Sequence, residues 1–171
     1  MYGLIKIPIT QKDSMLARTE ISSGVGIKTT AKTTTNDENQ RSVNMWRIPQ
    51  NTWIWGFFTG ISKIANREFD YDISGIQDIQ YLEYKVGDYY VTHSDINDGA
   101  GGERKISMSW TLNDDYEGGD LKIYHGGEKV VIDNKSSEIV AFTSFMDHSV
   151  SIVTKGKRKV LVCWIKGNRW R

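Results

Sequence analysis

The chain has 171 residues, of which 39% are hydrophobic and 11% aromatic, and its 22 basic and 21 acidic residues leave a net charge of +1. A chain of this size can bury a hydrophobic core as one domain, the near-neutral charge argues against an extended nucleic-acid surface, and the single cysteine, Cys163, excludes an internal disulfide and favours a reducing compartment. Because no apolar run approaches the roughly 20 residues of a membrane span and the N-terminus lacks the features of a secretory signal peptide, we expect a single-domain, monomeric protein of the cytoplasm.

The N-terminal part of the chain is predicted to form a strand followed by a mobile loop. Residues Gly3 to Ile9 alternate apolar and polar side chains, as in a half-buried strand. From Ser22 to Gln40 the composition changes to Gly, Thr, Lys, Asn and Ser, so this stretch has little to bury. A long loop in a compact domain is often a lid or a binding loop, but a surface connection without such a role fits the sequence equally well.

One long helix is predicted from Asn51 to Arg67, with Pro49 just before its start. Its apolar side chains recur at three- and four-residue spacing, which is the pattern of an amphipathic helix. They are Trp53, Ile54, Phe57, Phe58, Ile61, Ile64 and Ala65. An apolar face this rich in aromatic residues is expected to pack against a sheet and support it.

After Phe69 the predicted elements are short strands separated by turns, most of them rich in glycine. The candidate strands are 69–73, 78–84, 88–93, 104–112, 120–125, 129–133, 138–143, 148–153 and 158–165. Many short strands preceded by a helix predict a mainly β domain, a sandwich or barrel with a helical buttress. The expected organisation is one domain over residues 1–171, with an N-terminal extension (1–45), a supporting helix (46–68) and a β core (69–165).

Three residues with metal-binding side chains stand out in the strand region. His93 and Asp95 are separated by one residue and therefore share one face of a strand, while His148 begins a distant candidate strand. Two imidazoles and one carboxylate form the facial triad of non-haem Fe(II) oxygenases, which leaves coordination positions open. Taken alone, the pair is better explained by a loop histidine and a turn-forming aspartate, so the downstream residues decide between the two interpretations.

Arg158 opens the last predicted strand. Trp164 and two valines of this strand share its face, so the guanidinium points the same way as three apolar side chains. A guanidinium that faces inward needs an anionic partner, because a buried unpaired charge is costly. A bound dicarboxylate would satisfy it.

Together these residues resemble the 2-oxoglutarate- and Fe(II)-dependent dioxygenases, and more narrowly their prolyl 4-hydroxylase branch. The resemblance extends from about Asn66 to Ile165 and rests on the order and spacing of several short motifs, none of which is specific alone. The motifs are Asn66-x-x-Phe69, Gln80-Tyr-x-x-Tyr84-x-x-Gly-x-Tyr-x-x-x-His93-x-Asp95, Leu112-Asn113-Asp114-x-x-x-Gly118-Gly119-x-Leu121, His148-x-Val150 and Gly156-x-Arg158-x-x-x-x-x-Trp164.

The resemblance implies a double-stranded β-helix (a cupin-like jelly roll) that holds iron at its open end. The implied Fe(II) ligands and catalytic residues are His93, Asp95 and His148. Arg158 would pair with the distal carboxylate of 2-oxoglutarate, and Tyr84 would line the cosubstrate pocket. With O2 as the second cosubstrate, 2-oxoglutarate is converted to succinate and CO2 while a substrate C–H bond is hydroxylated, and ascorbate is a candidate reductant.

Two tryptophans complete the expected cosubstrate site. Trp110 stands where animal prolyl hydroxylases carry a tyrosine that helps to bind the distal carboxylate, and an indole N–H can donate a hydrogen bond but cannot accept one. Trp164 lies on the predicted face of Arg158. It stands where the related nucleic-acid demethylases carry a second arginine, so that activity fits this chain less well.

The oxidised substrate is open at this point. The resemblance favours 4-hydroxylation of a proline in a protein or peptide; the alternatives are a free amino acid, a lysyl side chain or another small metabolite. The basic segment from Lys155 to Arg171 could touch nucleic acid, but lysines on terminal strands more often keep an edge solvated. A jelly-roll module without catalytic activity is the remaining alternative, and the complete triad with its arginine argues against it.

Overall fold

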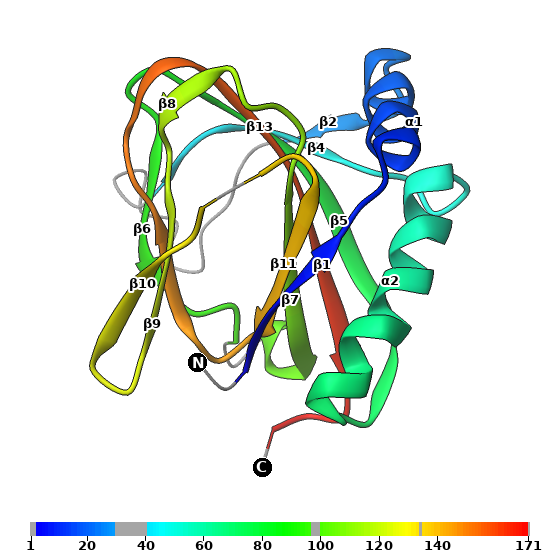
Figure 1. Ribbon diagram of the computed structural model, residues 1–171. Helices are drawn as coiled ribbons and strands as arrows, with labels where there is room; N and C mark the ends of the chain where they lie inside the picture. The colour runs from blue at the N-terminus through cyan, green and yellow to red at the C-terminus, as the bar shows by residue number, and fades with distance from the viewer. Residues whose placement is uncertain (1–2, 30–40, 97–99, 134, 171) are drawn as a thin grey trace.

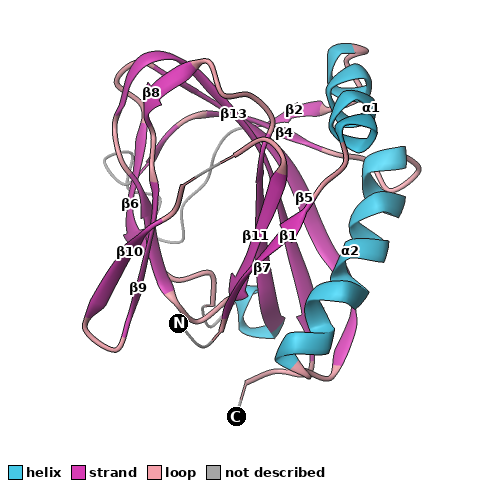
Figure 2. Ribbon diagram, viewed as in Figure 1, coloured by secondary structure: helices cyan, strands magenta, loops and turns pink. Residues whose placement is uncertain are grey.

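The computed structural model describes residues 3–29, 41–96, 100–133 and 135–170, and within them it shows a mainly β domain with two α-helices (Figure 1; Figure 2). Its elements are β1 (Leu4–Pro8), α1 (Gln11–Ser22), β2 (Ile27–Thr29), β3 (Arg41–Ser42), β4 (Asn44–Arg47), α2 (Trp53–Phe69), β5 (Ile73–Lys85), β6 (Tyr89–His93), the 3-10 helix η2 (Ala100–Glu103), β7 (Arg104–Thr111), β8 (Tyr116–Gly118), β9 (Leu121–His125), β10 (Glu128–Val131), β11 (Glu138–Thr143), β12 (Asp147–Val150) and β13 (Val153–Gly167).

The strands form two antiparallel sheets that face each other. The larger sheet has the order β1-β11-β7-β13-β5-β4-β2, and β8 pairs with β13 beside it. The smaller sheet has the order β10-β9-β12-β6-β3. Both helices cover the outer face of the larger sheet, so its inner face is left to meet the smaller one (Figure 1). This arrangement confirms the predicted jelly-roll core.

The larger sheet divides its side chains between two cores, because successive residues of a strand point to opposite faces. On β13, Leu161, Cys163 and Ile165 join the core under the helices. Val160, one position away from Leu161, belongs to a second core between the sheets, together with Tyr84 of β5. The inner face of β13 therefore lines the interior of the jelly roll.

Helix α2 confirms the predicted helix to within two residues at each end, but helix α1 was not predicted. The buried face of α1 is made of the small residues Ser14 and Ala17, so the helix has no periodic apolar stripe. Its one readable signal was its start, where the Thr10 hydroxyl accepts a hydrogen bond from the Asp13 amide at 3.1 Å. The expectation of one supporting helix is thus corrected to two in the described part of the chain.

Helix α1 also supports the start of α2. The two carboxylate oxygens of Glu20 accept hydrogen bonds from the backbone amides of Trp53 (2.9 Å) and Ile54 (2.8 Å). These amides belong to the first turn of α2, where backbone donors have no partner within the helix and a negative charge is favourable. The N-terminal extension is therefore tied to the helix that backs the sheet.

The strand predictions were less complete than the helix prediction. Residues 69–73 were expected to form a strand, but Phe69 ends α2, Ile73 begins β5 and the residues between them are irregular. The Asn66 side chain holds this connection, because it donates to the carbonyl of Tyr71 (2.9 Å) and accepts from its amide (3.1 Å). Asp70 takes the left-handed conformation that ends α2, with φ of 52°. Strands β2, β3, β4 and β8 are too short or too polar to have been predicted.

The predicted loop from Ser22 to Gln40 is partly replaced by structure. Within it, β2 pairs with β4, while residues 30–40, where a lid was considered, lie outside the described residues.

In the described part of the chain, neither helix combines the length and the apolar content that crossing a bilayer requires.

Candidate active site

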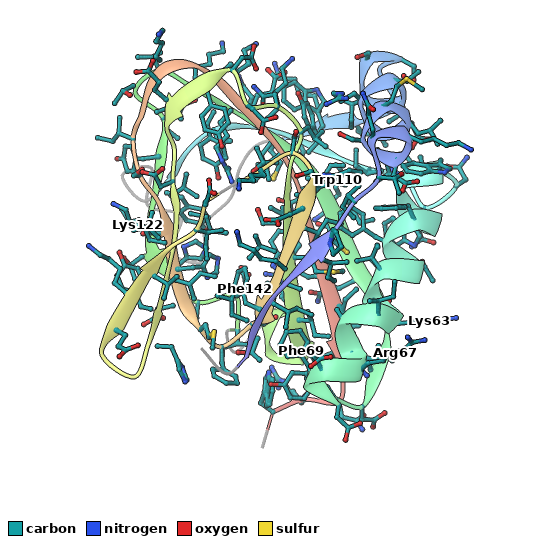
Figure 3. The ribbon with its side chains drawn as sticks, viewed as in Figure 1. Lys63, Arg67, Phe69, Trp110, Lys122 and Phe142 are labelled. Atoms are coloured by element: carbon teal, nitrogen blue, oxygen red, sulfur yellow. The ribbon has the colours of Figure 1, made fainter. Side chains whose placement is uncertain are left out.

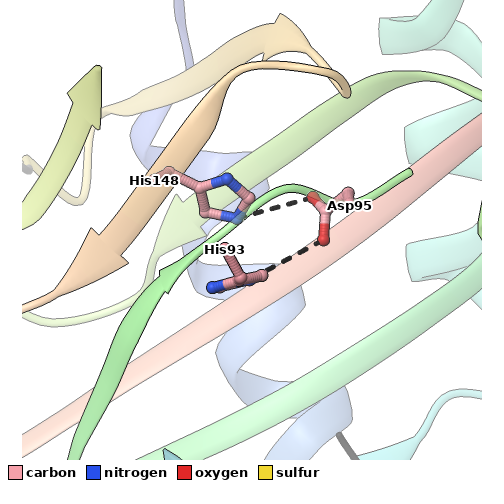
Figure 4. Close-up of side chains that lie close together, drawn as sticks. All are labelled: His93, Asp95 and His148. Carbon is pink, nitrogen blue, oxygen red and sulfur yellow. Dashed lines mark ion pairs between the residues drawn. The ribbon is translucent and has the colours of Figure 1, made fainter. Parts of the chain in front are cut away.

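The three predicted metal ligands meet in the interior of the jelly roll. His93 ends β6 and lies directly opposite His148 of β12 in the smaller sheet, and Asp95 follows two residues after His93. The Nε2 atom of His93 lies 3.9 Å from Oδ1 of Asp95, and the Nε2 atom of His148 lies 3.5 Å from Oδ2 (Figure 4). One ligand atom from each residue falls within 4.8 Å of the other two, so one small ion could contact all three.

Backbone carbonyls fix the protonation of both imidazoles. The Nδ1 atom of His93 lies 2.8 Å from the carbonyl of Val91, and Nδ1 of His148 lies 3.1 Å from the carbonyl of Met146. A carbonyl oxygen only accepts, so each Nδ1 must carry the proton and donate it. Each Nε2 then faces Asp95 and is the nitrogen left to bind a metal, which is the arrangement that metal-binding histidines adopt.

Asp95 is buried, and its environment keeps it ionised. Its Oδ2 accepts a hydrogen bond of 2.6 Å from the Ser107 hydroxyl, and its backbone amide donates to the Ser144 carbonyl at 3.1 Å. Burial by itself raises the pKa of this carboxyl. Positive charge on the His148 and His93 rings and on Arg104, together with the hydrogen bond from Ser107, acts in the opposite direction and holds the pKa of Asp95 below its usual range. The carboxylate is therefore ready to bind a cation.

Aromatic side chains pack against both imidazole rings. The His93 ring stacks on Tyr90 with centroids 3.6 Å apart, and the His148 ring meets the edge of Phe142 at 4.9 Å. The side chain of His93 keeps 18% of its surface exposed, compared with 9% for His148. Two imidazoles and one carboxylate, reachable from one side, fit a divalent transition metal such as Fe(II) with open positions.

Arg158 lies farther along the inner face of β13, where it is 1% exposed. It pairs with Tyr84 across β13 and β5, and its guanidinium carbon lies 5.4 Å from the centre of the Tyr84 ring. Its Nε atom is buried without a hydrogen-bond partner, and no carboxylate of the described residues forms an ion pair with it. The residues thus fit an anionic ligand that enters the interior.

Gly119, part of the Gly-Gly motif, makes room for this arginine. It has φ of 63°, and a Cβ atom there would lie 3.0 Å from both Cδ of Arg158 and Cγ2 of Val153. A larger residue would be strained by the backbone conformation and would also press on the arginine. The glycine therefore leaves room for the Arg158 side chain.

The placement of Trp110 corrects the prediction made for it. Trp110 belongs to the core under the helices, where its ring lies 5.1 Å from that of Phe57 and its Nε1 donates to the carbonyl of Ser136 (3.0 Å). Figure 3 shows it on the helix side of the sheet, whereas Phe142 points to the interior. Strand alternation turns Thr111, not Trp110, toward the interior beside Val160. The register had been assigned one residue off.

Trp164 lies on the face of Arg158, as predicted, but in a different environment. The guanidinium of Arg104 stacks over the Trp164 ring, and its central carbon lies 4.1 Å from the ring centre. Arg104 and Ser107, both on β7 and both in contact with Asp95, were not identified from the sequence. Nothing in their local pattern marks them, because their contacts depend on how β7 lies against the segment after β6.

Comparisons with known proteins agree with this geometry. The sequence profile described as the 2OG-Fe(II) oxygenase superfamily matches residues 79–166. A PKHD-type hydroxylase of Synechococcus sp. (strain CC9311) is 40% identical over 79 residues, which is 45% of this chain and 36% of that protein. The chain therefore matches little more than a third of the length of this curated relative.

Two solved structures share the fold at low sequence identity. A Pseudomonas putida prolyl-4-hydroxylase superposes with a TM-score of 0.76 at 17% identity, covering 98% of this chain and 94% of its own. A prolyl hydroxylase of Trichoplax adhaerens, solved with a peptide of the hypoxia-inducible factor, gives a TM-score of 0.77 at 18% identity, covering 97% and 84%. The profile match extends over more than half of the chain and contains the whole His-Asp-His cluster and Arg158. The chain belongs to the 2OG-Fe(II) oxygenase superfamily.

Proposed function

We propose that the chain is a hydroxylase in which His93, Asp95 and His148 hold Fe(II) and Arg158 binds the distal carboxylate of 2-oxoglutarate. The observation that carries this proposal is the state of Arg158: a buried cation, without a described anionic partner, on a face that leads to the triad. An unpaired buried charge is costly, and a dianionic cosubstrate supplies the missing partner.

The side chains of the chain have distinct tasks in this reaction. When bound, Fe(II) supplies the redox chemistry that couples decarboxylation of 2-oxoglutarate to hydroxylation of a C–H bond. Arg158 orients the cosubstrate by a fork of N–H donors, a geometry that matches a carboxylate. Tyr84 and Val160 belong to the buried core beside Arg158 and would keep bulk water away from the ion pair, which strengthens it.

Peptidyl-proline 4-hydroxylation is the proposed substrate activity. It is supported by the fold shared with the two prolyl hydroxylases, one of them solved with a peptide, and by the PKHD-type hydroxylase name of the sequence relative. On this proposal the partner is a proline-containing protein or peptide. A cytoplasmic location and the use of ascorbate stay predictions.

Hydroxylation of a free amino acid, a lysyl side chain or another small polar molecule is the second candidate, and one feature of the interior favours it. Gln80 lies on the inner face of β5, two residues from Leu82 of the inner core, and its Oε1 is buried without a partner. Its Nε2 donates to Asp78 (3.0 Å), which also accepts from Arg47 (3.2 Å). The amide is thereby oriented, and its oxygen is left to accept a hydrogen bond from a polar substrate.

A succinate-release assay separates these candidates. The full chain is supplied with Fe(II), 2-oxoglutarate and O2, and with proline peptides, free amino acids or methylated oligonucleotides in turn. We expect proline peptides to stimulate succinate formation and to gain one oxygen atom by mass spectrometry. If free amino acids are oxidised and no peptide is, the polar-metabolite activity replaces the prolyl one.

A further inference from the structure

Arg104 is the second arginine of the interior, and several groups of the protein contact its guanidinium. Its Nε donates to Oε1 of Gln77 at 2.6 Å, and its Nη1 donates to the backbone carbonyl of Asp95 at 3.3 Å. The same Nη1 lies 3.7 Å from Oδ1 of Asp95. The guanidinium rests on the Trp164 ring at 4.1 Å. One side chain thus contacts both the backbone and the carboxylate of a proposed metal ligand.

Irregularities in two strands create this arrangement. In the pairing of β13 with β5, Trp164 lies opposite Asp78 and Ile165 opposite Ile76, so Gln77 is the extra residue of a bulge. A bulge redirects a side chain, and here Gln77 reaches Arg104. A second shift between β13 and β7 occurs next to Arg104 itself. One bulge therefore brings Gln77 to Arg104, and the other lies beside Arg104 on β7.

The C-terminal segment fixes the backbone of Arg104 as well. The indole Nε1 of Trp170 donates to the Arg104 carbonyl at 2.7 Å, and the Trp170 ring packs against Tyr71 with centroids 5.4 Å apart. Main chain and side chain of Arg104 are thus both restrained. Restraint of this kind is what a residue needs if it is to hold another residue in place.

We propose that Arg104 is a positioning residue: locked on Trp164 and Gln77, it sets the orientation of the Asp95 carboxylate for metal binding. The inference rests on the proposed function, because it takes Asp95 to be a ligand of Fe(II). Ser107 holds Oδ2 from one side, and Arg104 holds the backbone and Oδ1 from another. The carboxylate is left with little freedom to turn away from the two imidazoles.

The sign of the effect of removing Arg104 separates positioning from simple electrostatics. A guanidinium beside a cation site repels the incoming ion, so loss of its charge alone would strengthen metal binding. Loss of orientation has the opposite effect, since removing groups that orient metal ligands typically weakens affinity by about 10–100-fold. A weaker site after removal of a positive charge therefore identifies Arg104 as a positioning residue.

The experiment measures the dissociation constant of Mn(II), in the absence of cosubstrate, for the full chain and three variants. Arg104→Gln is expected to weaken Mn(II) binding by about 10–100-fold. Arg104→Lys keeps the charge but loses the planar fork, and Trp164→Leu removes the aromatic ring under the guanidinium. The Mn(II) dissociation constants of these two variants are expected to lie between those of Arg104→Gln and wild type. Arg18→Gln is the matched control, because Arg18 also donates to a backbone carbonyl (Leu112, 3.2 Å) but lies outside the jelly roll.

Two further readouts keep the outcomes distinct. With saturating Co(II), the visible absorption of Arg104→Gln should differ from wild type, since it reports the geometry of the bound ligands, and thermal unfolding of the metal-free proteins checks that each variant folds. If Arg104→Gln does not fold, Arg104→Lys and Trp164→Leu decide the matter by the same measurements. Unchanged or tighter Mn(II) binding with unchanged Co(II) spectra in the folded variants overturns the positioning role. Failure of the wild type to bind any of these ions would instead overturn the proposed function.

Discussion

Among the described residues, two buried or half-buried arginines of the jelly-roll interior, Arg104 and Arg158, differ in their partners. Arg104, beside the metal triad, has a hydrogen-bond acceptor, a carboxylate and an aromatic platform from the protein itself. Arg158, on the inner face of β13, has the ring of Tyr84 nearby, and its Nε has no hydrogen-bond partner among the described residues. A cation whose partners are all internal serves the architecture of the site. One that lacks an internal anion indicates where a ligand must supply it.

Fe(II) binding beside Arg104 depends first on Asp95. Asp95→Ala should abolish saturable Fe(II) binding, because it removes the carboxylate of the triad and leaves two imidazoles as ligands. Anaerobic titration with Fe(II) and 2-oxoglutarate, followed by visible absorption, measures the loss. Asp133→Ala, a change at an exposed aspartate paired with Lys135, should bind iron as the wild type does. Wild-type iron affinity in Asp95→Ala would remove the triad from the account.

Substitutions on the two faces of β7, at Trp110 and Thr111, should have the next largest effects. Trp110→Ala should lower the free energy of unfolding by about 3–5 kcal/mol, since its ring is fully buried under the helices, and it should leave 2-oxoglutarate affinity unchanged in protein that remains folded. Thr111→Val, on the inner face of β7, should change the free energy of unfolding little and should measurably lower the affinity for 2-oxoglutarate. Chemical denaturation and calorimetric titration supply the two quantities. A cosubstrate effect confined to Trp110→Ala would restore the original assignment of that residue.

Stability without ligand compares the two arginines directly. Arg158→Met removes an unpaired buried charge and should stabilise the metal-free, cosubstrate-free protein by about 1–3 kcal/mol. Arg104→Met removes a fully partnered one and should destabilise it by a similar amount, because Gln77 and the Asp95 carboxylate lose their donor. Urea unfolding of both variants measures the difference. Destabilisation of similar size in both would mean that Arg158, too, is satisfied by the protein.

Cys163, on the outer face of β13, should not react with thiol reagents in the folded protein. Cys163 is fully buried, and burial raises the pKa of its thiol well above the usual value, so little of the reactive thiolate forms. We expect no reaction with a thiol reagent in the native state and complete reaction after unfolding. Rapid native labelling that inactivates the enzyme would place the thiol within reach of the site.

The elements that were predicted from sequence are those with a strong local pattern. Helix α2 and the strands β7 and β11 were assigned to within two residues at their ends, whereas β13 begins five residues before the predicted strand 158–165. The spacing of His93 and Asp95 indicated a shared metal site. Helix α1 was missed because Ser14 and Ala17 form its buried face. The assignment of Trp110 failed because a shift of one residue moves a side chain to the other face of a sheet.

The contacts of Arg104 could not have been predicted from any local pattern. They arise where two bulged strand pairs and the segment after β6 meet, and they join Gln77, Asp95 and Trp164 across 87 positions of sequence at most. The charge of Arg158 was easier to interpret, because its neighbours on β13 are apolar and the alternation alone placed it inside. Sequence thus identified the arginine that we propose binds the cosubstrate, and the structure was needed for the arginine that we propose orients the metal site.

The most direct test of the central claim is the affinity of the Fe(II)-loaded protein for 2-oxoglutarate, compared with a 2-oxo acid that lacks the distal carboxylate. The wild type should prefer 2-oxoglutarate strongly, whereas Arg158→Met should bind the two acids almost equally and keep its affinity for Fe(II). An undiminished preference for 2-oxoglutarate in Arg158→Met would contradict the account, because another group would then be receiving the distal carboxylate.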